Sequence, residues 1–98
     1  MIAPADCRTM AEVRAGVDAL DAEIVALLAT RFAFMDAAAR IKGERGQVRD
    51  EPRKAQVIAN AQAVAAETGA PVFVIGALWE QLVEASIAYE LTKFDAKP

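Results

Sequence analysis

The chain has 98 residues, so we expect one domain spanning residues 1–98. Its net charge of −3 disfavours nucleic acid and acidic membranes as partners, and it contains no histidine, the commonest general base and metal ligand. Hydrophobic residues make up 55% of the chain but aromatics only 6%, with alanine dominant. This composition favours closely packed helices and predicts an all-α fold.

The single cysteine, Cys7, excludes an intrachain disulfide and is typical of a reducing compartment. A structural zinc site is not expected with one cysteine and no histidine, and nothing indicates a cofactor. The first residues lack a basic stretch followed by an apolar core, and no apolar run approaches the roughly 20 residues of a membrane span. We therefore expect a cytoplasmic protein with no membrane partner.

A long first helix is predicted from Thr9, which forms a capping-box pattern with Glu12. The positions of its inner face are spaced by threes and fours, as on one side of a helix: Val13, Val17, Leu20, Ile24, Leu27, Arg31, Met35, Ala38 and Lys42. This helix would have about 34 residues and a length of roughly 50 Å. A glycine-containing loop over residues 43–50 follows it.

Two shorter helices complete the predicted fold. Asp50 is a suitable N-cap for the second helix, and Gly69 is a natural terminator for it. The third helix is predicted over residues 71–94, apolar on most of its circumference, with Glu80 and Glu84 on the side that faces solvent. No strand signal and no internal repeat are present.

The unequal helix lengths predict an oligomer. The second and third helices, at about 16 and 24 residues, span roughly 24 and 36 Å. Neither covers a 50 Å apolar stripe along its whole length. Another chain must bury the remainder, so we expect an obligate homodimer built around the long helices.

Arg31 is a permanent cation on this apolar stripe. Its neighbours on adjacent turns contain no acid: Leu27, Leu28, Phe34 and Met35. A charge held against apolar surface without a partner costs several kcal/mol. Lys42 lies eleven residues further on, at nearly the same angle. The partner of these cations is therefore expected elsewhere in the fold or in an anionic ligand.

Arg14 lies 17 residues before Arg31, about 25 Å along the helix, which is too far to share a small ligand within one chain. In an antiparallel dimer, the partner's residue at this position would lie beside the second half of the helix. Simpler interpretations exist. Arg14 can pair with Asp18, Arg31 can extend toward solvent or meet an acid such as Asp21 of the other chain, and Lys42 can complement a helix end.

Three further residues are candidates for ligand contacts. Arg53 lies in the first turn of the second helix, where its charge opposes the helix dipole unless an anion binds there. Ser86 and Glu90 are four residues apart, on a face of the third helix turned away from Glu84. They are either a satisfied core pair or ligand contacts.

The run from Val13 to Arg31, with Leu20-Asp21 inside it, resembles the opening helix of the all-helical chorismate mutase family. The resemblance covers nearly the whole chain and extends through Lys42, the loop 48–50 and Arg53. It implies an intertwined homodimer with two equivalent sites, each using Arg14 from the opposite chain.

By position, the resemblance implies that Arg14, Arg31 and Arg53 bind the carboxylates of a small dianion and stabilise its charge. Ser86 would contact a carboxylate, and Asp50 would lie at a loop position that contacts backbone or a substrate hydroxyl. No cofactor or metal is implied.

The resemblance implies that Lys42 donates a hydrogen bond to the ether oxygen of the substrate, at the bond that breaks. Glu90 stands where the family usually has glutamine, and an ionised carboxylate cannot donate a hydrogen bond. We therefore predict that Glu90 must be protonated for full activity. Lys54 stands where many members carry a glutamate near the substrate hydroxyl, which leaves the substrate open.

The implied reaction is the concerted rearrangement of chorismate to prephenate, which needs no nucleophile, metal or base. The alternatives are an isochorismate pyruvate-lyase on the same fold, which the start Pro4-Ala-Asp6-Cys7 resembles, an aminodeoxychorismate mutase, and a non-catalytic dimeric module that binds such a metabolite.

Overall fold

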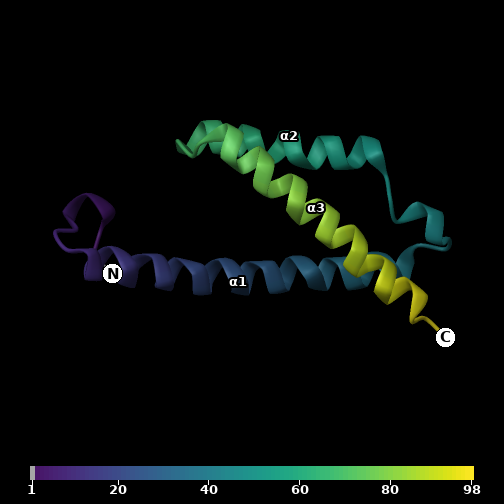
Figure 1. Cartoon of the computed structure of the whole chain (residues 1–98). Coiled ribbons are helices and arrows are strands. Elements are labelled where there is room, and N and C mark those ends of the chain that lie inside the picture. Colours follow the sequence, from purple (N-terminus) through teal and green to yellow (C-terminus); the bar gives the residue numbers. More distant parts are fainter. Residues whose placement is uncertain (1) are drawn as a thin grey trace. The chain divides into compact units, whose positions relative to one another are not determined.

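The computed structural model describes residues 2–98, which fold into helices and turns without a strand. The elements in chain order are η1 (Pro4–Asp6), α1 (Met10–Ile41), η2 (Arg45–Gln47), α2 (Glu51–Thr68) and α3 (Val72–Asp95), as Figure 1 shows. The prediction of three helices, long, short and medium, is confirmed. The short 3-10 turns η1 and η2 were not predicted.

α1 has 32 residues and begins as the capping signal predicts. The Thr9 hydroxyl accepts a hydrogen bond from the Glu12 amide at 3.2 Å. Glu12 Oε1 accepts from the Arg8 amide and from the Thr9 hydroxyl, so its return bond reaches one residue further back than in the ideal motif. The helix start is thus fixed by local side chains.

α2 and α3 form a helical hairpin. The Asp50 carboxylate accepts a hydrogen bond from the Arg53 amide at 3.0 Å, the expected N-cap. Gly69 closes α2 in the left-handed conformation, with φ of 79°, which glycine adopts without steric cost. α3 then packs against α2, and the two helices diverge from the hairpin turn toward the start of α2 and the end of α3 (Figure 1).

The chain separates into two compact units, divided inside α1 after Phe34. In the first unit, over residues 2–34, no residue is buried, and the predicted stripe is substantially exposed: Val13 38%, Val17 49%, Leu20 43% and Ile24 51%. In the second unit, Met35–Pro98, the buried core consists of Val48, Val83 and Ile87, with Val57, Ile58, Leu91 and Phe94 packed against it.

α3 is long and apolar enough, by length and composition, to cross a membrane. This differs from the expectation that no segment approaches a membrane span. The core helix of a soluble protein can have the same length and composition. Glu80 and Glu84 of α3 form ion pairs with Lys54 of α2.

Candidate active site

Lys42 and Glu90 meet in the second unit. Lys42 follows the last residue of α1, and its amide still donates to the Ala38 carbonyl at 2.9 Å, so it continues the helix geometry. Its ammonium donates to Glu90 Oε2 at 2.9 Å. The Glu90 side chain is 6% exposed and that of Lys42 is 30% exposed. A buried carboxylate is thus compensated by a partly accessible cation, as burial of a charge requires.

Ser86 lies one turn before Glu90 on α3 and is also buried, with 4% exposure. Its hydroxyl donates to the Leu82 carbonyl of its own helix at 2.7 Å. This bond satisfies the hydroxyl without a ligand, as the core interpretation expected. Rotation of the hydroxyl would be needed for it to donate elsewhere.

Asp50 and Arg53 lie together at the start of α2. Both are exposed, and Arg53 Nη1 donates to Gln56 Oε1 at 2.7 Å on the same helix. Within residues 2–98, no hydrogen bond or ion pair joins either residue to Lys42 or Glu90. Asp50 serves here as the helix cap, so its side chain already has a structural role.

The two remaining predicted residues belong to the first unit. Arg14 is exposed on α1, and Arg31 is half-buried. The local pairing of Arg14 with Asp18 is absent from the ion pairs of the described chain. Arg14 therefore has no structural partner on its own helix.

An ion-pair network joins the start of α2 to α3. Arg49 contacts Glu84 at 2.8 Å, and Lys54 contacts both Glu80 at 2.7 Å and Glu84 at 2.9 Å. Hydrogen bonds from Arg49 and then Lys54 lower the pKa of Glu84 from 4.5 to about 2. The bond to Glu80, then that to Glu84, raises the pKa of Lys54. Lys54 is thus a structural cation, with its side chain 16% exposed.

Glu80 and Glu84 lie on a solvent-accessible side of α3, as expected, with 48% and 40% of the side chain exposed. The sequence did not predict that both also form ion pairs with Lys54. The sequence alone does not show which face of α3 meets α2.

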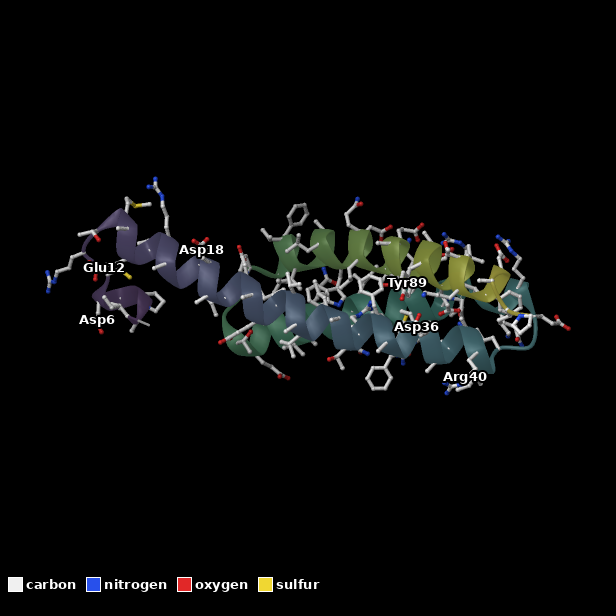
Figure 2. All side chains as sticks on the ribbon, turned by 90° about the horizontal axis from the view of Figure 1, so that it is seen from below. Asp6, Glu12, Asp18, Asp36, Arg40 and Tyr89 are labelled. Carbon is white, nitrogen blue, oxygen red and sulfur yellow. The ribbon has the colours of Figure 1, made fainter. Side chains whose placement is uncertain are left out.

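A second polar cluster links the end of α1 to α3, and no sequence pattern predicted it. The Tyr89 hydroxyl donates to Asp36 Oδ1 at 2.8 Å, and Figure 2 shows these two side chains facing each other. The bond to Asp36, together with burial and the charge of Asp36, raises the pKa of Tyr89. Lys93 approaches Asp36 at 3.9 Å and the Tyr89 ring at 5.5 Å. These partners are more than 50 positions apart, beyond any local pattern.

Two hollows occur in the first unit, of about 150 and 530 Å³. Apolar side chains line most of the smaller one, which includes Cys7 and the stripe residues Val13, Val17 and Leu20. Neither hollow is lined by a predicted site residue. Among residues 2–98, no group of three or more His, Cys, Asp and Glu side chains is placed to hold a metal ion.

The second unit therefore offers a buried hydroxyl and a buried carboxyl on neighbouring turns of α3, with the Lys42 ammonium bound to the carboxyl. Such a set can donate to and accept from a small polar ligand, and it contains no activated nucleophile. Its chemistry is binding and electrostatic stabilisation.

Comparison with known proteins agrees with this chemistry. An isochorismate pyruvate lyase of Pseudomonas aeruginosa is 28% identical over 91 residues, covering 93% of this chain and 90% of the relative. Residues 13–91, which include most of α1, all of α2 and most of α3, match the family described as chorismate mutase type II. The chain belongs to the chorismate mutase type II family.

Proposed function

We propose that the protein is a chorismate mutase, with Lys42 and Glu90 at the reacting centre. The observation that carries this proposal is the 2.9 Å contact between the Lys42 ammonium and the 6% exposed Glu90 side chain, in a member of this family. Ser86, one turn away, supplies a hydroxyl on the same helix. Asp50 and Arg53 at the start of α2 contribute a second polar edge.

The proposed reaction breaks the ether C–O bond of chorismate and forms a C–C bond within the same molecule, so atoms and electrons balance without a co-reactant. The protein holds the reactive conformer, which lowers the entropic part of the barrier. It also stabilises negative charge that develops on the ether oxygen. Lys42 donates to that oxygen, and Glu90 donates to it only when protonated.

We propose that the active form is a homodimer. The exposed positions Val13, Val17, Leu20 and Ile24 recur every three or four residues along the first unit, and covering them with a second copy would remove them from water. In this assembly, Arg14 from the partner chain and Arg31 bind the carboxylates of the substrate. A dianion then meets guanidinium groups, which suit carboxylates because of their planar, bidentate geometry.

A second candidate function is the elimination of pyruvate from isochorismate to leave salicylate. The relative from Pseudomonas aeruginosa, named for that lyase activity, favours this alternative. The same cations would bind the same two carboxylates. A third candidate is a non-catalytic module that binds one of these dianions.

One experiment distinguishes the three candidates. The purified protein is incubated with chorismate and, separately, with isochorismate, and prephenate, salicylate and pyruvate are measured by chromatography. Prephenate from chorismate supports the proposal. Salicylate with equimolar pyruvate as the principal products would replace it with the lyase, and binding without turnover would replace it with the module.

A variant pair links turnover to the site. Lys42→Met removes the donor to the ether oxygen and is expected to lower kcat/KM by about 100-fold or more, the usual effect of losing one such donor. Lys93→Met makes the same change of charge at a lysine outside the proposed site. Equal activity in Lys42→Met and wild type would exclude Lys42 from the reaction.

A further inference from the structure

The end of α1 is completed by a residue that lies beyond α3. The last carbonyls of a helix have no partner within the helix. The amide of Gly43, which would have bonded to the Ala39 carbonyl, donates instead to Gln47 Oε1 at 3.0 Å. Lys97 supplies the missing donor, because its ammonium binds the Ala39 carbonyl at 2.8 Å and the Lys42 carbonyl at 2.9 Å.

Lys97 is itself held in place. Its amide donates to the Phe94 carbonyl at 3.1 Å, and its ammonium lies 4.3 Å from the centre of the Phe94 ring. Phe94 packs against the buried core of the second unit. The neighbouring Asp95 binds Arg45 at 2.9 and 3.3 Å, which ties the same end of α3 to η2. The ammonium is therefore anchored through packing and charge.

These contacts hold Lys42 by both its side chain and its main chain. Its side chain reaches Glu90 on α3, while its main-chain carbonyl is bound by Lys97 just after α3. Glu90 and Lys97 are seven residues apart, about two helical turns. α3 and the residues directly after it thus fix both the backbone and the ammonium of Lys42.

We propose that Lys97 is a positioning residue, which sets the place of the Lys42 ammonium relative to Glu90. This inference rests on the proposed function for the role of Lys42 in catalysis. Reaction rates are sensitive to such placement, because a displacement of about 1 Å can lower the rate on the order of 100-fold. Lys97 touches no reacting atom and acts only through Lys42.

A simpler role for Lys97 is a favourable charge near the C-terminal end of α1. Lys93 provides a control for this role. It carries the same charge, lies four residues earlier and contacts the α1 residue Asp36, but the two carbonyls at the end of α1 are bound by Lys97. If only the positive charge matters, replacing either lysine should have the same effect. If Lys97 positions Lys42, only replacement of Lys97 should displace Lys42.

The first test does not depend on turnover. Amide hydrogen exchange at Lys42 is measured by NMR in Lys97→Met, Lys97→Arg and Lys93→Met. We expect exchange about 10-fold faster in Lys97→Met, because the last turn of α1 loses its donor, with partial or full recovery in Lys97→Arg. Unchanged exchange in Lys97→Met, or an equal rise in Lys93→Met, would overturn the inference.

The second test measures kcat and KM with chorismate and with isochorismate. Lys97→Met is expected to lower kcat/KM by about 10-fold, mainly through kcat, and Lys97→Arg to restore at least part of it. In a Lys42→Met background, the added Lys97→Met change should have no further effect. A full additional decrease in that background would show that Lys97 acts independently of Lys42 and would overturn the inference.

The two tests keep the proposals distinct. If wild type converts neither substrate, the proposed function fails, and the exchange data alone decide whether Lys97 fixes Lys42. If wild type is active and the exchange rate rises without loss of kcat/KM, the positioning role fails while the proposed function stands.

Discussion

The exposed stripe of the first unit leads to a quantitative prediction for Ile24→Asp. The Ile24 side chain is 51% exposed, and full burial of such a side chain stabilises by roughly 1.5–3 kcal/mol. Covering the exposed half contributes roughly 0.8–1.5 kcal/mol in each chain, or roughly 1.5–3 kcal/mol in a symmetric dimer. An unpaired aspartate at the interface adds a desolvation cost of several kcal/mol for each ion. With about 3 kcal/mol for each of the two aspartates, the combined loss is about 8 kcal/mol, which raises the dimer dissociation constant by more than five orders of magnitude.

Sedimentation velocity over a range of protein concentrations measures this change. Wild type should be dimeric and Ile24→Asp monomeric in the micromolar range, with loss of turnover because the partner's arginine is missing. Ala22→Asp is the matched control, since residue 22 lies about 160° around the helix from residue 24. The reasoning is refuted if wild type is a monomer at these concentrations, or if Ile24→Asp and Ala22→Asp dimerise equally well.

Three further predictions concern single carboxylates. Glu90→Gln can donate to the ether oxygen without binding a proton, so the pH–rate profile of the variant should differ from that of wild type. Superimposable profiles would contradict the proposed role of Glu90. Glu84, with a pKa lowered to about 2, stabilises the fold above its usual pKa of 4.5, and this contribution is lost as pH falls toward 2. Glu84→Gln should therefore be less stable than wild type at pH 7 and lose less stability on acidification. Urea unfolding at several pH values measures this. Parallel plots of unfolding free energy against pH for wild type and Glu84→Gln would be inconsistent with this role. Asp50→Ala removes the N-cap of α2 and should lower the free energy of unfolding by about 1 kcal/mol. Asp50→Asn should retain most of the stability that the cap supplies. Equal stabilities of the two variants would rule out the cap.

The helix boundaries were predictable because the signals that set them are local. Thr9 and Glu12 at the start of α1, Asp50 before α2 and Gly69 after it each satisfy nearby backbone groups or adopt a conformation of their own. The last turn of α1 was harder to place. Its end depends on Gln47, because the Gly43 amide donates to the Gln47 side-chain oxygen and so does not continue the helix.

The partners of charged side chains were predictable only in part. The carboxylates that Lys54 contacts are on α3 rather than on its own helix, and this choice of partner depends on how α3 packs against α2. Glu80 is exposed to solvent as predicted, but its contact with Lys54 could not be read from the local sequence. The contact between Lys42 and Glu90, 48 positions apart, could be anticipated only because a family resemblance assigns both positions to one reacting oxygen.

In the proposed site, Lys42 and the arginines have different roles. The Lys42 ammonium contacts the Glu90 carboxyl, so this pair supplies at most the one positive charge of Lys42, which does not balance a dianion. In the proposed mechanism, arginines balance the ligand's two charges, while Lys42 supplies a directed hydrogen bond. Since one of these arginines, Arg14, would come from the partner chain, substrate binding and dimer formation are linked. Activity per chain should then decrease when the protein is diluted below the dimer dissociation constant, and saturating substrate should shift that decrease to lower protein concentration.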